Sequence, residues 1–100
     1  MNNVDKIEEL IKRRRLQIML HSVLYYYYGG SIISDQQFDR WAYELLDLQN
    51  KYPLESKKAP HYDLFSDWDA SSGFDLQIPG EMYYRARCVK RYHDKNLKFQ

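Results

Sequence analysis

A helix start near residue 34 constrains this sequence most, because several independent start signals coincide there. Ser34-Asp35-Gln36-Gln37 is a capping box, in which the Ser34 side chain accepts a hydrogen bond from the Gln37 backbone and the Gln37 side chain reaches back. Ile33 and Phe38 occupy the hydrophobic-staple positions on either side. We therefore predict a helix from Asp35 to just before Pro53. Its apolar face comprises Phe38, Trp41, Ala42, Leu45 and Leu48.

A longer helical pattern precedes this one and ends at Gly29-Gly30. One apolar face contains Val4, Ile7, Ile11 and Ile18, and is interrupted by Arg14. A second face contains Leu16, Leu20, Val23, Leu24 and Tyr27, so we expect Tyr27 to pack inside. Because the linker between the two patterns is short, residues 4–53 are predicted to form an antiparallel helical hairpin.

The rest of the chain divides into an irregular segment, 54–79, and a basic helix, 80–97. The irregular segment contains Pro60 and a Ser-Ser-Gly run, but also large apolar side chains that we expect to wrap onto the hairpin: Tyr62, Leu64, Phe65, Trp68, Phe74 and Leu76. The basic helix places Met82, Ala86, Val89 and His93 on one face. Residues 1–100 are thus predicted to form one small, mainly α domain.

Composition excludes several classes of protein. A formal net charge of +1 argues against a uniformly basic nucleic-acid binder and against an acidic DNA mimic. No apolar run is long enough to cross a membrane, and the single cysteine, Cys88, cannot form an internal disulfide. We therefore expect a cytoplasmic protein. We predict no metal site, because the cluster of His61, Asp63, Asp67 and Asp69 lacks the spacing of a calcium loop.

Charge is divided unevenly along the chain. Residues 1–34 carry five basic and three acidic side chains, and residues 80–100 carry six basic and two acidic ones. Residues 35–79 between them carry four basic and nine acidic side chains. The basic helix also contains tyrosines, and Tyr and Arg are enriched where proteins bind each other. We therefore predict a partner-binding surface formed by Tyr83, Tyr84, Arg85, Arg87, Arg91 and Tyr92. Lys12-Arg13-Arg14-Arg15 forms a second basic patch, and the sequence leaves open whether the two converge.

Residues 7–53 also contain a set of motifs in a particular order. Tyr25-Tyr26 precedes the Gly29-Gly30 turn, Ile33-Ser34-Asp35-Gln36-Gln37-Phe38-Asp39 follows, and Glu44-Leu45 and Tyr52-Pro53 come later. This arrangement resembles the N-terminal domain Ia of bacterial NAD-dependent DNA ligases. The whole chain is also similar to small stand-alone ligase-like proteins of bacteriophages.

The resemblance implies a nucleotide site. In the ligases, domain Ia grips the nicotinamide mononucleotide half of NAD, and the matching positions here are Tyr25, Tyr26, Asp35, Phe38 and Asp39. Aromatic faces can stack on nicotinamide, and carboxylates accept hydrogen bonds from hydroxyl or amide groups. Phe38 stands where the family usually has Tyr, and Tyr26 where it often has His. We expect such binding, with NMN or NAD, to be weak.

The ligase nucleotidyl-transfer motif Lys-x-Asp-Gly is absent from these residues, so we predict that the chain is not an enzyme. Three functions remain open. The first is a non-catalytic phage-type protein that binds and inhibits a host nucleic-acid enzyme or a nuclease-based defence system. The second is a nicotinamide-nucleotide-binding module, and the third is a DNA- or RNA-binding accessory protein. The sequence does not define the oligomeric state.

Overall fold

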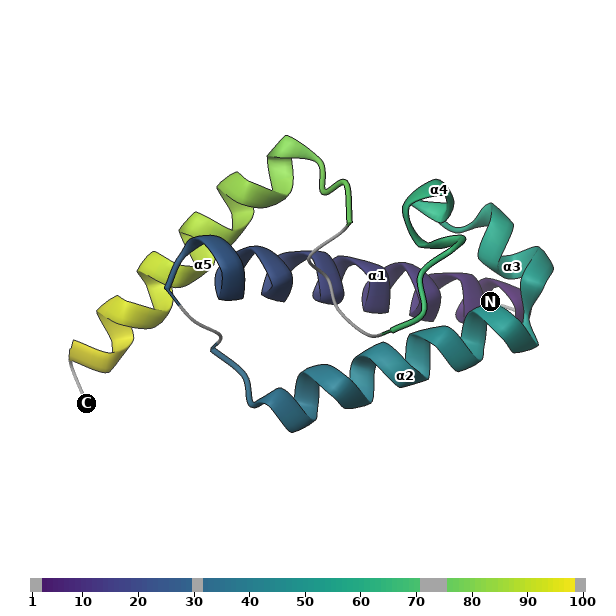
Figure 1. The fold of residues 1–100 in the computed structure, drawn as a ribbon, viewed down its shortest axis with the longest axis horizontal. Coiled ribbons are helices and arrows are strands. Elements are labelled where there is room, and N and C mark those ends of the chain that lie inside the picture. The colour runs from purple at the N-terminus through teal and green to yellow at the C-terminus, as the bar shows by residue number, and fades with distance from the viewer. Residues whose placement is uncertain (1–2, 30–31, 71–75, 99–100) are drawn as a thin grey trace.

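The computed structural model describes residues 3–29, 32–70 and 76–98 (Figure 1), and they form helices with no strand among them. The mainly α fold predicted from the sequence is confirmed. The helices, in chain order, are α1 (Asn3–Tyr27), α2 (Asp35–Lys51), α3 (Pro53–Lys58), α4 (Tyr62–Phe65) and α5 (Gly80–Lys98).

Helices α1 and α2 form the predicted antiparallel hairpin, and α2 lies along most of the length of α1 (Figure 1). Ser34 caps α2 as expected, because its Oγ accepts a 3.0 Å hydrogen bond from the backbone N–H of Gln37. The helix ends at Lys51, and after Tyr52 the next helix, α3, begins at Pro53. The start and end of α2 therefore follow from local sequence signals.

The segment 54–79 is more regular than the sequence analysis predicted, because it contains most of α3 and all of α4. Both helices are short, and α3 has an acidic residue in its first turn and lysines in its last, which suit the helix dipole. His61 adopts a left-handed conformation, with φ 70°, and this reverses the chain before α4. Six and four residues are too few to show a helical period in the sequence.

The main core lies between the hairpin and the residues that follow it. Ile11, Ile18, Ala42 and Leu45 are fully buried, and so is Phe65 of α4. Leu64, Trp68 and Leu76 pack against the same cluster. The expectation that this aromatic-rich segment wraps onto the hairpin is confirmed for these residues, whereas Phe74 lies outside the described ones.

Arg15 is a fully buried cation that joins α1 to α2 and to the segment beyond α2. Its Nη2 donates to the Oγ of Ser56 at 2.7 Å and to the Ser56 carbonyl oxygen at 3.1 Å. Its Nη1 donates to the carbonyl oxygens of Ala59 and Pro60 at 3.1 and 3.0 Å, and its Nε to Gln49 at 3.0 Å. Burial lowers the pKa of Arg15 to about 10, so the guanidinium is still charged at neutral pH.

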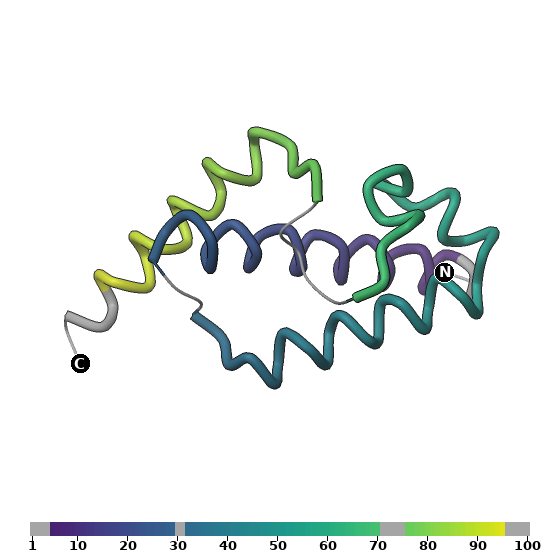
Figure 2. Tube along the Cα trace, viewed as in Figure 1, coloured from purple at the N-terminus to yellow at the C-terminus, as the bar shows by residue number. Residues whose placement is uncertain are grey.

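Helix α5 packs on the C-terminal half of α1 and crosses it at an angle, as the tube in Figure 2 shows. Met82 and Ala86 of α5 are buried, and Ala86 forms a second cluster with Val23 and Leu24 of α1. The predicted apolar face of this helix is confirmed at these positions. The C-terminal part of α5 extends past the end of α1, so the two helices pack against each other only along part of their length (Figure 1).

Candidate functional site

Two tyrosines mark the end of the hairpin where α1 stops. Tyr25 and Tyr26 are 55% and 41% exposed, and their rings meet edge to face with centroids 4.9 Å apart. This exposure leaves part of each ring surface accessible to a ligand. These two residues are the aromatic part of the predicted nucleotide site.

Two carboxylates mark the matching end of α2. Asp35 and Asp39 are both exposed and lie four residues apart, so they project from one side of the first two turns. The positive end of the helix dipole stabilises their negative charge. Phe38 lies between them in sequence, is half-buried and packs against the main core. We call Tyr25, Tyr26, Asp35, Phe38 and Asp39 the hairpin end, since all five lie where α1 finishes and α2 begins.

His21 and Trp41 lie one turn below the hairpin end, on the facing sides of α1 and α2. Their ring centroids are 5.4 Å apart, and His21 is only 7% exposed. The Nδ1 atom of His21 has no hydrogen-bond partner among the described residues. Burial lowers the pKa of His21, which favours a neutral ring at pH 7. The only sign of this pair in the sequence is spacing, since His21 precedes Tyr25 by one helical turn and Trp41 follows Phe38 by three residues.

The run of four tyrosines divides between two parts of the molecule. Tyr27 is 63% exposed, so the expectation that it packs inside is wrong. Its ring instead contacts the ring of Tyr83 on α5, with centroids 5.1 Å apart. The Tyr28 hydroxyl donates a 3.3 Å hydrogen bond to the backbone oxygen of Tyr83. Tyr25 and Tyr26 thus belong to the hairpin end, whereas Tyr27 and Tyr28 hold α5.

The predicted partner-binding residues of α5 divide between those that line a groove and those that lie outside it. Tyr84 and Arg85 line a groove of about 550 Å³ between α1 and α5. Tyr83 is half-buried and turned toward Tyr27 and Tyr28. The other three are exposed and lie outside the groove: Arg87, Arg91 and Tyr92.

The basic run of α1 is also divided by the fold. Lys12 and Arg13 line the same groove as Arg85, so one part of the run meets the C-terminal basic helix. Arg14 instead faces α2, where its Nε is 3.0 Å from Glu44 and its guanidinium lies over the Trp41 ring. Arg15 is buried. The expectation of one four-residue basic patch is therefore wrong, because helical spacing directs its members to different neighbours.

The described residues provide neither a metal site nor a membrane-spanning helix. Among residues 3–29, 32–70 and 76–98, no three His, Cys, Asp or Glu side chains lie close enough together to hold a metal ion. None of the described helices combines the length and apolar character needed to cross a membrane.

The fold and the hairpin end describe a small helical module of the kind expected from the resemblance to DNA ligases. Comparison with known proteins confirms that resemblance. The chain is 33% identical over 99 residues to the DNA ligase of Fervidobacterium nodosum, covering 94% of this chain and 14% of the ligase. It is 44% identical over 49 residues to the DNA ligase of Pseudothermotoga lettingae, covering 49% of this chain and 7% of the ligase.

A third relative, the DNA ligase of Petrotoga mobilis, is 38% identical over 61 residues, which cover 60% of this chain and 9% of the ligase. The chain therefore spans only a small part of the length of these curated relatives. No family model matches it, and no solved structure does.

These comparisons overturn the first of the three functions considered above. The relatives are all named DNA ligase, and none is a phage protein or an inhibitor of a host enzyme or defence system. The prediction of a phage-type inhibitor is therefore wrong. The absence of a catalytic motif and the Tyr and Arg residues of α5 do not by themselves define such a function.

Proposed function

We propose that this chain is a nicotinamide-nucleotide-binding module, and that its hairpin end takes the nicotinamide mononucleotide half of NAD. The observation that carries the proposal is the similarity to a DNA ligase over 94% of the chain, because NAD-dependent ligases use such a domain for this half of the dinucleotide. The exposed rings and carboxylates at the hairpin end support it.

The chemistry of the hairpin end suits an oxidised nicotinamide ring. That ring carries a positive charge, so it is attracted both to tyrosine faces and to nearby carboxylates. Asp35 and Asp39 supply two negative charges on one side of α2, and Tyr25 and Tyr26 supply the aromatic surface. The carboxylates can also accept hydrogen bonds from the carboxamide or from ribose hydroxyls. Phe38 adds apolar contact but no hydroxyl, which removes one possible hydrogen bond.

The proposal assigns binding rather than turnover to this chain. The matched segment is a small part of each ligase, and the sequence contains no Lys-x-Asp-Gly motif to form an enzyme–adenylate. A site that holds half of a dinucleotide makes few contacts, so we expect a dissociation constant in the millimolar range. The other half of NAD would remain in solvent or contact another protein.

Isothermal titration calorimetry with nicotinamide mononucleotide tests this proposal. We expect saturable binding that weakens about tenfold in Asp35→Ala and in Asp39→Ala, because each loses a charged acceptor. Asp47→Ala is the matched control, since Asp47 is an exposed acid of α2 outside the hairpin end. The absence of heat at millimolar ligand, or equal weakening in the control, would contradict the proposal.

The reduced nucleotide gives a second test of the same site. Reduction removes the positive charge of the nicotinamide ring but leaves the ribose and phosphate unchanged. We therefore expect weaker binding of the reduced form, by about fivefold. Equal affinity for the two forms would show that the ring does not lie against Tyr25, Tyr26 and the carboxylates.

A further inference from the structure

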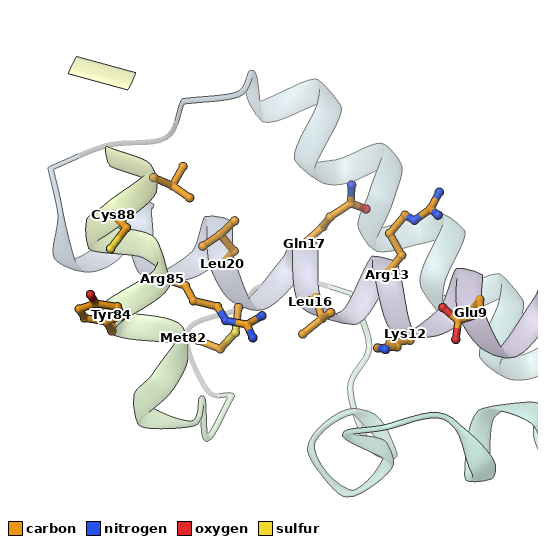
Figure 3. Close-up of a pocket in the computed structure, with 11 residues that line it drawn as sticks. Glu9, Lys12, Arg13, Leu16, Gln17, Leu20, Met82, Tyr84, Arg85 and Cys88 are labelled. Atoms are coloured by element: carbon orange, nitrogen blue, oxygen red, sulfur yellow. The ribbon is translucent and has the colours of Figure 1, made fainter. Parts of the chain in front are cut away.

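The groove between α1 and α5 is separate from the hairpin end, and it combines an apolar floor with basic edges. Its floor includes Leu16 and Leu20 of α1 and Met82 and Val89 of α5, and its volume is about 550 Å³. Figure 3 shows Leu16 and Leu20 on the α1 side, facing Met82 on the α5 side. A partner that covers these apolar side chains removes them from water, which is favourable.

Positive charge predominates at the edges of the groove. Lys12 and Arg13 come from α1 and Arg85 from α5, and Figure 3 shows the Arg85 side chain extended toward α1. No carboxylate among the described residues is paired with any of these three cations. Glu9 is the single acid that lines the groove, and Figure 3 places it at the end farthest from α5. The groove therefore favours an occupant that carries negative charge beside an apolar face.

We propose that the α1–α5 groove binds an acidic amphipathic peptide segment of a partner protein, with apolar side chains on the floor and carboxylates against Lys12, Arg13 and Arg85. The α1 residues that line the groove extend from Glu9 to Leu20, a length of about 16 Å, which fits two to three turns of a helix. Helix-in-groove binding uses apolar residues at three- and four-residue spacing.

An acidic peptide fits this groove better than a nucleic acid does. Phosphodiester backbones bind to basic surfaces without covering aliphatic side chains, and single-stranded bases require aromatic faces on which to stack. The floor here is formed by leucine, methionine and valine side chains, and the one ring in the lining, Tyr84, is 66% exposed. The apolar floor would therefore remain uncovered under a phosphate backbone. This proposal is independent of nucleotide binding at the hairpin end.

Cys88 provides a direct readout, because it is the only cysteine in the sequence, is exposed and lines the groove. The probe is a synthetic helical peptide with leucines on one face and glutamates beside them. We expect this peptide to slow alkylation of Cys88 by iodoacetamide at least fivefold at saturation, with a dissociation constant in the micromolar range. The measurement needs no substitution, so it is unaffected by any loss of folding. Unchanged alkylation at millimolar peptide would overturn the proposal.

A lysine-containing peptide and DNA are the controls that distinguish the proposed occupant from the alternatives. The same peptide with lysines in place of the glutamates is expected to bind at least tenfold more weakly. Equal protection of Cys88 by both peptides would show that charge plays no part and would overturn the proposal. Protection by duplex or single-stranded DNA that is stronger than protection by the acidic peptide would identify a nucleic-acid site instead.

Charge reversal tests the edges of the groove. Arg85→Glu is expected to weaken peptide binding about fivefold to tenfold, measured by fluorescence anisotropy. Arg87→Glu is the matched control, because it makes the same change on an exposed residue of α5 outside the groove. We expect this control to alter affinity by less than about twofold. Equal weakening in the two variants would assign the effect to overall charge and contradict the proposed location.

Discussion

Arg15 is a positive charge in the interior of the molecule, and its acceptors explain how the helices around it are fixed. Four of its five hydrogen bonds go to residues of the segment 56–60, and the fifth goes to Gln49 of α2. No carboxylate is among these partners. Backbone carbonyl oxygens thus satisfy the guanidinium, whose planar shape lets it donate in several directions at once.

Replacing Arg15 is expected to destabilise the fold strongly. Arg15→Met fills similar space but leaves the buried acceptors of Ser56 and Ala59 without a donor, so we expect a loss of about 3 kcal/mol in the free energy of unfolding. Arg15→Lys keeps the charge but not the planar group, and should fall between Met and wild type. Urea unfolding measures both. Arg13→Met, at an exposed neighbour, should change stability by less than about 0.5 kcal/mol.

His21 gives the stability a dependence on pH. Burial lowers its pKa in the folded state, so the unfolded chain binds a proton first as pH falls through about 6.5. Stability is therefore expected to decrease from pH 7 toward pH 5, by at most about 1.4 kcal/mol for each pH unit. Urea unfolding of wild type and His21→Phe at both pH values isolates this effect. An identical decrease in the two proteins would assign it to other groups.

The sequence predicts the burial or capping role of a residue well where its neighbours along the chain determine that role. The Ser34 cap and the burial of Ile11, Ile18, Ala42 and Leu45 were predictable, because helical spacing and capping are local. The burial of Arg15 was not, because its acceptors are backbone carbonyls 41 to 45 residues away. A carbonyl is present at every residue, so the sequence contains no sign of which ones will converge.

At the scale of elements, the two helices of the hairpin are aligned by where each one begins and ends. Helix α2 starts at the Ser34 cap and ends before Pro53. These limits, together with the position of α2 along α1, determine which residues lie at the hairpin end. Arg14 with Glu44, and His21 with Trp41, then meet across the hairpin. Helix α3 has a start signal in Pro53, but α3 and α4 are both too short to show an apolar period, which explains why the sequence indicated irregular structure there.

Removing the α2 cap tests this role. Ser34→Ala deletes the acceptor of the Gln37 N–H, and we expect it to lower the free energy of unfolding by about 1 kcal/mol. Ser34→Asp retains an acceptor at the same position and should restore most of this loss. Thermal unfolding followed by circular dichroism measures both variants. Equal stability of the alanine and aspartate variants would show that the cap contributes little.

At the scale of the whole molecule, the two proposed sites use different pairs of helices. The hairpin end depends on α1 and α2, whereas the groove depends on α1 and α5. Helix α5 contacts α1 through the small cluster of Val23, Leu24 and Ala86, and it also contributes Met82 to the main core, so a change at Ala86 should disturb α5 more than α2. The run 12–15 is divided between the groove, the α2 side of α1 and the interior, and the sequence does not predict this division, since it depends on which helix covers each side of α1.

Ala86→Leu should separate the two sites experimentally. Ala86 is fully buried against α1, so a larger side chain forces α5 away and is expected to cost about 1 to 3 kcal/mol. Amide hydrogen exchange should accelerate in α5 but not in α2, because the local opening of α5 becomes easier. Acidic-peptide binding should then weaken while nicotinamide mononucleotide binding is retained.

Arg87→Leu, on the exposed side of the same helix, should leave exchange in α5 unchanged. Parallel loss of both ligands in Ala86→Leu would mean that α5 and the hairpin end form one cooperative unit rather than two independent sites.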